Sequence, residues 1–549
     1  MASTSILRWR RSAAQLHALE QVEREIRASD PNGRRKYLQE FSRAFRNYQS
    51  VLTPQQLANA LSAASTLLVG DYHALPASQR FAGRLVQELS ARGPIVLGVE
   101  TVFSRDQRIL DAWFRRRITE QELRAKLRFD QDWGYPWEPF YAMIEAARSS
   151  GAPVYGLDCL PREDLRKIGT RDRHAAATIA ELRRLYPEAR IVAVFGESHL
   201  APGHLPRLLR RRLPHERILT VLQNVDALYW KAAGERTERV DAVRLSERAV
   251  CVFNSTPLEK YESYRLCLDA WRQSTSGVPD FAPSVHNLIE SLARFLDLRR
   301  YCERYGRTDR FVRDQLPEVC FRNSDIAFRR RARGSRLVND LIAASARLEE
   351  YGSAYLPTMN SIYVSDFQMA YVAEEAAHFL HHACRGALDR ANRHGFKSLR
   401  SEDRFYRRVV EHAVGYFGSR VLYPARPAVR PDELETLYRQ PQRNIERRTI
   451  YRYGEYIRMI DFLVLHKRHE QAPSRHRAGL LREGLRCKGA KFEYLTRRLG
   501  YMLGSELYDA YLQGRVTQRF LAALMFRTLE QPGSARAAYF AAIRKLRKP

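Results

Sequence analysis

The chain has 549 residues, of which 45% are hydrophobic and 28% charged, and this combination predicts two or three globular domains. Its apolar content excludes a mainly disordered chain, and no uninterrupted apolar run approaches the roughly 20 residues that a membrane helix needs. The formal net charge of +30 leaves a nucleic-acid-binding or scaffold protein as an alternative. Because no recognition motif accompanies the arginines, a solvated basic surface is the simpler interpretation.

Cysteine usage and the N-terminal sequence bear on the cellular compartment. The seven cysteines are widely spaced and contain no CxxC pair, which argues against a disulfide framework and a thiolate zinc site. No apolar stretch of the kind found in signal peptides follows Arg8, Arg10 and Arg11. We therefore expect a cytoplasmic protein with reduced cysteines and no membrane span.

Residues 1–61 are predicted to form a helical lead-in. Within it, Thr53 is a candidate N-cap, Pro54 suits the first helical position, and Gln56 completes a capping box. A helix should therefore begin directly after Thr53.

Residues 62–280 show the pattern of a parallel α/β domain. Six short apolar runs, separated by turn residues and helical stretches, lie at residues 66–69, 95–99, 154–157, 191–195, 218–222 and 249–253. Runs without polar alternation are typical of strands buried on both faces, and helices between them imply right-handed crossovers. After the sixth run no comparable run recurs, and residues 281–549 are predicted to form a mostly α-helical domain of unknown role.

Polar residues that follow these runs are the candidate site residues. In a parallel sheet, ligands bind beyond the carboxyl ends of the strands, where His73, Glu100 and His199 are expected to meet. Two histidines with acidic neighbours suit metal or haem binding, and they suit general acid–base catalysis equally well. Strand-end polar groups also cap helices, but for these three residues together the functional interpretation is favoured.

Three of these strand-end segments resemble the ChaN-like haem-binding domain, a relative of erythromycin esterases and of the Tiki and TraB proteins. The matching motifs are Gly70-Asp71-Tyr72-His73, Gly98-Val99-Glu100-Thr101 and Gly196-Glu197-Ser198-His199, and the segment from Asp132 through Tyr141 resembles the family's aromatic helix. The resemblance covers residues about 62–258. It implies a cofactor or substrate pocket lined by Asp71, Tyr72, His73, Glu100, Tyr141 and His199, with Asp71 standing where the family usually has Glu.

Two functions follow from this resemblance. In the first, the pocket binds haem or a divalent metal, with His73 or His199 as ligand and Glu100 as its partner. In the second, the protein is a hydrolase in which His73 is the general base, Glu100 orients it, and His199 stabilises the developing anion or holds a metal. Either function requires a small-molecule ligand.

A second cluster lies in the predicted helical domain. Glu375, His378 and His382 are spaced three and four residues apart and would share one helix face, which is metal-ligand spacing. A further ligand would have to come from Glu411 or His412 on another helix. Because no second Glu-x-x-His unit is present, a face without bound metal is the favoured interpretation.

Overall fold

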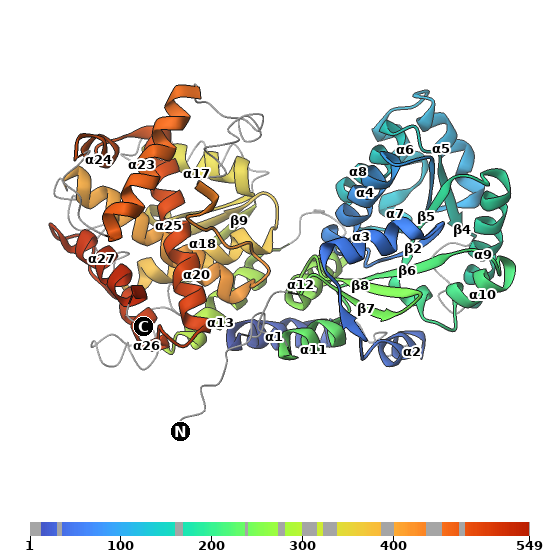
Figure 1. Ribbon diagram of the computed structural model, residues 1–549, viewed down its shortest axis with the longest axis horizontal. Coiled ribbons are helices and arrows are strands. Elements are labelled where there is room, and N and C mark those ends of the chain that lie inside the picture. Colours follow the sequence, from blue (N-terminus) through green and yellow to red (C-terminus); the bar gives the residue numbers. More distant parts are fainter. Residues whose placement is uncertain are drawn as a thin grey trace. The chain divides into compact units, whose positions relative to one another are not determined.

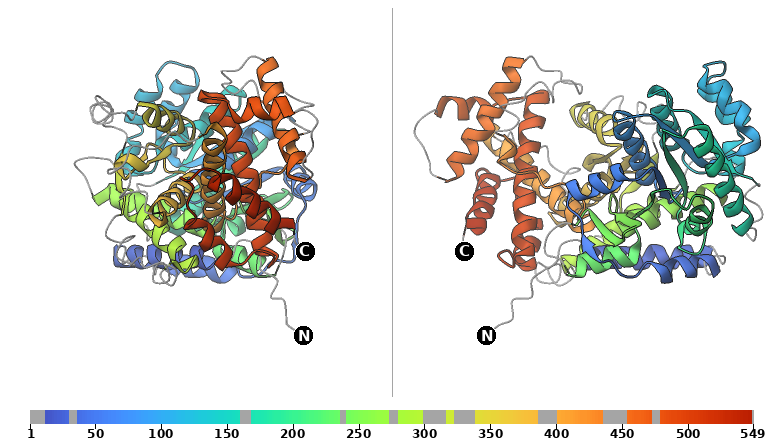
Figure 2. Two further views of the ribbon diagram at one scale, coloured as in Figure 1. Left: turned by 90° about the vertical axis from the view of Figure 1, so that its left-hand side faces the viewer. Right: turned by 45° about the vertical axis from the view of Figure 1, so that its right-hand side comes forward.

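The computed structural model describes residues 12–29, 36–159, 168–235, 240–272, 280–298, 316–321, 338–385, 400–434, 453–471 and 478–547. By its internal contacts the chain divides into two compact units. The first, called here the α/β unit, is Leu19–Asp280, and the second, called the helical unit, is Met1–Ala18 with Phe281–Pro549. The expected fold class, an α/β sheet domain followed by a mostly helical region, is confirmed (Figures 1 and 2).

The α/β unit contains one eight-stranded sheet with the order β1-β7-β8-β6-β2-β5-β3-β4. The strands are β1 (Ser50–Val51), β2 (Thr66–Asp71), β3 (Ile95–Phe103), β4 (Val154–Asp158), β5 (Arg190–Gly196), β6 (Ile218–Gln223), β7 (Ala242–Ser246) and β8 (Ala249–Val252). The six expected runs form the parallel part, from β4 to β8. The sheet is nevertheless mixed, because β7 and β1 add an antiparallel edge.

Burial explains why the apolar runs predicted strands. Every residue of β2, β3 and β6 is buried, as expected for strands covered on both faces. Helices α4 and α8 pack on one side of the sheet, and α9 and α10 pack on the other (Figure 1). The helices of this unit are α2 (Lys36–Ala44), α3 (Pro54–Ala63), α4 (Pro76–Ser90), α5 (Gln107–Phe114), α6 (Glu120–Lys126), α7 (Phe129–Asp132), α8 (Trp137–Ser149), α9 (Ile168–Leu185), α10 (Leu205–Arg212), α11 (Asp226–Glu235) and α12 (Pro257–Arg272), while α1 (Ala13–Ser29) contains the boundary between the units.

The expected capping box is present. The Thr53 hydroxyl accepts from the Gln56 backbone N–H, the Gln56 side chain accepts from the Thr53 N–H, and Pro54 begins α3. The segment before it differs from the expected helical lead-in, because residues 50–51 form β1 and pair with β7.

The helical unit consists of packed helices with one small sheet. Its helices are α13 (Ala282–Phe295), α17 (Val338–Tyr351), α18 (Met369–Cys384), α20 (Ser401–Leu422), α23 (Tyr453–Gln471), α24 (Ala478–Leu485), α25 (Gly489–Leu512), α26 (Gln518–Met525) and α27 (Ser534–Arg547). Strands β9 (Glu318–Phe321), β10 (Ser353–Leu356) and β11 (Ser361–Val364) form a three-stranded sheet. These three strands were not among the elements expected from the sequence, in which no comparable apolar run follows residue 253. These strands are only four residues long, too short to give a distinctive pattern.

Helix α20 is enclosed by close helix contacts that depend on glycine. A Cβ atom at Gly504 of α25 would lie 2.6 Å from the backbone oxygen of Ala413, and one at Gly418 would lie 2.5 Å from the Cβ of Ala377 on α18. Because these distances are below van der Waals contact, glycine is what allows α18 and α25 to approach α20 this closely.

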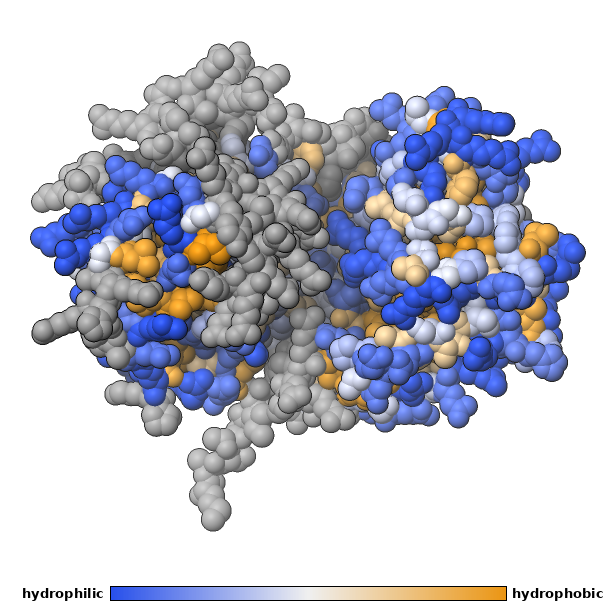
Figure 3. All heavy atoms as spheres, turned by 45° about the horizontal axis from the view of Figure 1, so that its top comes forward, coloured by the Kyte–Doolittle hydropathy of each residue, from blue (hydrophilic) through white to orange (hydrophobic). Residues whose placement is uncertain are grey.

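The described surface is largely polar. On the face shown in Figure 3, hydrophilic side chains predominate and apolar ones lie in separate patches. Within the described ranges, only Leu185, Trp271 and Leu316 are exposed large hydrophobic residues, and no helix is long and apolar enough to cross a membrane. Six of the seven cysteines lie in the described ranges, and Cys302 lies outside them.

Candidate functional site

Three strands and the turns that follow them bring His73, Glu100 and His199 together. Parallel pairing sets Asp71 at the end of β2 opposite Gly196 at the end of β5, so that the segments carrying the two histidines begin at the same edge of the sheet. Glu100, on β3, lies between the two rings. Its Oε2 is 3.5 Å from Nε2 of His73, and its Oε1 is 3.7 Å from Nε2 of His199.

These side chains line a cavity of about 170 Å³. Asp71, Arg171 and Glu197 add further charged groups to its wall, and Trp133 and Tyr135 supply aromatic surface. The His73 ring packs against both, with centroids 5.4 Å from the Trp133 ring and 5.3 Å from the Tyr135 ring. The site is therefore a small cavity with charged groups on its wall and an aromatic side.

His73 is held between two carboxylates. Its Nδ1 donates to Oδ2 of Asp71 at 2.8 Å, and the same oxygen accepts from Nε2 of Gln79 at 3.3 Å. Burial alone would lower the pKa of His73, but the charge and hydrogen bond of Asp71, together with those of Glu100, raise it to about 9. The ring is consequently protonated at neutral pH.

Glu100 is kept ionised by strong donors. Arg171 on α9 donates from Nη2 to Glu100 and also binds Asp158, at the end of β4, through Nε at 3.0 Å and Nη2 at 2.7 Å. Burial opposes ionisation, but Arg171 and the two histidines hold the pKa of Glu100 well below its usual range. The Gly196 N–H also donates to this carboxylate, and a Cβ at 196 would lie 2.9 Å from Oε2, which explains the glycine there.

His199 belongs to a chain of hydrogen bonds that leads away from the cavity. Its Nδ1 donates to Oδ1 of Asp172 at 2.6 Å, and the other Asp172 oxygen accepts from Nδ1 of His204 at 2.9 Å. Nε2 of His204 is in turn 3.2 Å from Oε2 of Glu40, a carboxylate whose side chain is 44% exposed. Asp172 therefore orients the His199 ring so that its Nε2 lies toward Glu100.

The two tyrosines predicted to line the pocket, Tyr72 and Tyr141, occupy different places. Tyr72 lines the cavity and lies under the buried Lys260, whose Nζ is 4.6 Å from the ring centre and 3.0 Å from Oε1 of Glu197. Burial raises the pKa of the Tyr72 hydroxyl well above its usual value. Tyr141 instead packs against Trp113 and Trp137 and is not part of the cavity wall.

Several polar residues near the cavity escaped the sequence reasoning. Arg171 and Asp172 come from α9, His204 immediately precedes α10, and Lys260 comes from α12. None of them follows an apolar run, so the strand-end rule could not find them. A buried Arg-Asp pair in one helical turn carries no distinctive local pattern.

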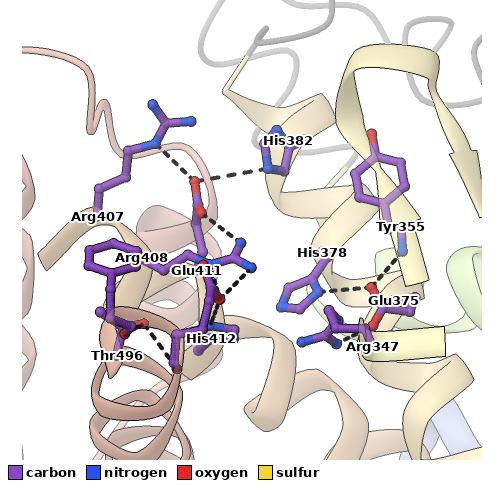
Figure 4. A network of polar contacts seen from close by, with 12 residues as sticks. Arg347, Tyr355, Glu375, His378, His382, Arg407, Arg408, Glu411, His412 and Thr496 are labelled. Atoms are coloured by element: carbon purple, nitrogen blue, oxygen red, sulfur yellow. Dashed lines mark hydrogen bonds and ion pairs between the residues drawn. The ribbon is translucent and has the colours of Figure 1, made fainter. Parts of the chain in front are cut away.

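The second cluster, in the helical unit, is arranged differently from its sequence prediction (Figure 4). Glu375 lies behind His378, with Oε2 3.1 Å from Nδ1, and His382 faces Glu411 at 3.9 Å. Among the described residues, the one group of three whose ligand atoms all lie within 4.8 Å of one another is Glu374, His378 and His412. The strand-end residues of the α/β unit do not form such a group.

The fold and the cavity define a class of protein: an α/β domain with a His/Glu pocket at the carboxyl ends of its parallel strands. Residues 57–201 match the family model described as haem-binding uptake, Tiki superfamily, ChaN, which confirms the ChaN-like domain expected from the motifs. The match covers this segment only and leaves the rest of the α/β unit and the helical unit outside it. No curated protein matches the chain.

Two solved structures are similar to part of the chain. One is titled "Cofacial heme binding to ChaN of Campylobacter jejuni"; it has 15% identity and a TM-score of 0.25, and the match covers 32% of this chain and 86% of that one. The other is titled "The structure of the type III effector HopBA1", with 14% identity, a TM-score of 0.28, and coverage of 38% and 96%.

Proposed function

We propose that the strand-end cavity is the active site of a hydrolase that acts on a small substrate by general acid–base chemistry. The observation that carries the proposal is the arrangement of two histidines around one carboxylate, each with a carboxylate partner of its own. Acid–base catalysis requires two titratable groups whose surroundings give them different protonation states. His73 is held between Asp71 and Glu100, and His199 is oriented by Asp172.

The geometry favours an assignment of roles opposite to the one expected from sequence. His73 is assigned as the acid because its pKa is raised to about 9, and His199, oriented by Asp172 through Nδ1, is assigned as the base. His199 takes a proton from water as the water oxygen bonds to the substrate. His73 is the acid and gives its proton to the leaving group as the scissile bond breaks. Glu100, fixed by Arg171, holds the two rings at the same cavity.

Hydrolysis of p-nitrophenyl esters of short acids is the direct test. We expect turnover by the full-length protein above the buffer rate and a loss of about 100-fold or more in His199→Ala, since general base catalysis contributes about 10²–10⁴-fold. His215→Ala is the matched control, because His215 is exposed. Absence of turnover, or equal turnover in both variants, would reject the proposal.

The pH dependence of this activity follows from the pKa of His73. Because the acid form is required, kcat/KM should fall as pH rises through about 9. Asp71→Asn removes the charge that raises this pKa, so the basic limb should move to lower pH. A pH profile of kcat/KM for both proteins measures the shift, and an unchanged basic limb in Asp71→Asn would contradict the role of His73.

Haem binding is the second candidate function, because residues 57–201 match a haem-binding family. The cavity, about 170 Å³, is smaller than the roughly 300–1,000 Å³ of usual small-molecule pockets, and both His73 nitrogens face carboxylates. With its side chains placed in this way, the cavity is too small for a haem macrocycle.

A haem titration separates the two functions. We expect the absorption spectrum of the full-length protein with added haem to be the same as that of the His73→Ala/His199→Ala double variant. A Soret shift in the wild type that is lost in the double variant would replace the hydrolase proposal with histidine ligation of haem.

A further inference from the structure

We propose that Glu374, His378 and His412 form a binding site for a divalent transition-metal ion such as Zn²⁺ in the helical unit. Their ligand atoms lie within 4.8 Å of one another, and all three residues are buried. Glu374 and His378 are four residues apart on α18 and share one face of that helix, while His412 comes from α20, against which α18 packs. Two helices therefore supply the ligands that a single helix cannot.

The hydrogen bonding of His378 is that of a metal-binding histidine. Its Nδ1 is bound to Oε2 of Glu375 at 3.1 Å, whereas its Nε2 is buried and has no hydrogen-bond partner among the described residues. Glu375 is fixed in turn by Arg347 and by the backbone N–H of Tyr355 at 2.9 Å. A carboxylate behind the imidazole sets the tautomer and leaves the second nitrogen free for a metal.

The environment of His412 supports the same site. Its side chain is fully buried, and neither ring nitrogen has a hydrogen-bond partner within the described part of the chain. An oxygen of Glu493 lies 3.7 Å from Nε2, which is too long for a hydrogen bond. An unsatisfied buried polar group costs about 1–3 kcal/mol, and a metal ion would remove part of this cost.

A glycine leaves space in front of the free nitrogen of His378. Gly415 lies in the middle of α20, one turn after His412, and a Cβ atom at this position would overlap Nε2 of His378. Glycine inside a helix is less favourable than alanine by about 1 kcal/mol, so its presence needs a packing or functional reason. Room for the His378 ring and for an ion beside it is such a reason.

Glu374 is oriented and kept ionised by its neighbours. Tyr501 donates to both oxygens, at 2.9 and 3.0 Å, and Arg426 lies 2.8 Å from Oε2. On Oε1 the further contact, to Arg347, is longer at 3.4 Å, and Arg347 has Glu375 as a second partner. An ion at Oε1 can therefore replace that contact without leaving Arg347 unpaired.

The donor set selects the class of metal. Two imidazole nitrogens and one carboxylate oxygen suit Zn²⁺ and similar ions, whereas Mg²⁺ and Ca²⁺ prefer oxygen ligands alone. Three protein ligands leave one tetrahedral position for water. Compared with the expectation from sequence, Glu375 becomes the residue that orients His378, and His382 lies outside the site.

Metal analysis of the full-length protein tests the site. After incubation with Zn²⁺ and removal of free ion, we expect about one equivalent of zinc in the wild type and in His73→Ala/His199→Ala, and none in His412→Gln. His381→Gln is the matched control and should retain the zinc, because His381 is also buried with both ring nitrogens unpartnered but lies outside the group of three. Absence of zinc from the wild type, or retention of zinc by His412→Gln, would overturn the proposal.

A spectroscopic measurement distinguishes the loss of a metal ligand from the loss of metal through misfolding. Cobalt replaces zinc in tetrahedral sites, and a thiolate bound to Co²⁺ gives a charge-transfer band in the near ultraviolet. His412→Cys should show this band with Co²⁺ if residue 412 is a ligand, and the band should be absent from His381→Cys. A folded, cobalt-loaded His412→Cys protein without the band would reject His412 as a ligand.

Discussion

Replacing Arg171 with Met is expected to destabilise the α/β unit by about 3–5 kcal/mol, because it removes the arginine that pairs with two buried carboxylates, Glu100 and Asp158. Urea unfolding followed by tryptophan fluorescence measures the effect on this unit alone, since Trp113, Trp133, Trp137, Trp230 and Trp271 all lie within it. Trp9, in the other unit, would be replaced by Phe in all the proteins compared.

A control on the same helix separates burial from charge. Arg184 of α9 pairs with Glu181, and both side chains are more than half exposed. Because exposed pairs contribute little, Arg184→Met should leave the urea midpoint unchanged. Equal midpoints for Arg171→Met and the wild type would show that the buried ion network does not stabilise the unit.

Replacing Glu411 with Leu should destabilise the helical unit by a similar amount, about 3–5 kcal/mol. This buried carboxylate lies 3.0 Å from Arg407 and 3.5 Å from Arg408 (Figure 4). It also lies 3.1 Å from Arg385. Its loss leaves Arg407 without this contact, while Arg385 and Arg408 keep Glu530 and Glu493. Thermal unfolding followed by far-ultraviolet circular dichroism reports on this helix-rich part of the chain.

Glu402 provides the comparison for Glu411 on the same helix. Its carboxylate lies 3.0 Å from Arg536, and both side chains are about half exposed. Glu402→Gln should therefore unfold at the wild-type temperature. If Glu411→Leu also unfolds at that temperature, the arginine cluster is stable without its central carboxylate.

The sheet could be predicted from sequence where its strands are buried on both faces. Leu67–Val69 and Ile191–Phe195 read as continuous apolar runs because helices cover them on each side. Strand β7 does not form a continuous apolar run, because Arg244 and Ser246 lie in its partly exposed half. An edge strand of this kind gives a weaker pattern, which other segments share.

The candidate sites show a similar limit. His73, Glu100 and His199 could be grouped in advance because the carboxyl ends of parallel strands meet at one edge. Arg171 and Asp172 could not, because only the packing of α9 on the sheet places them there. In the helical unit, spacing placed Glu375 and His378 on one face, but the packing of α18 on α20 decides that Glu374, and not Glu375, lies with His412.

The adjacency of Arg171 and Asp172 has a consequence for thermodynamic coupling. One turn of α9 supplies the partner of Glu100 and the partner of His199, so a displacement of this turn alters both hydrogen-bonded groups together. The effects of Arg171→Met and Asp172→Asn on unfolding should therefore not add in the double variant. The pocket then responds to changes in α9 as one cooperative element, even though its two histidines come from different strands.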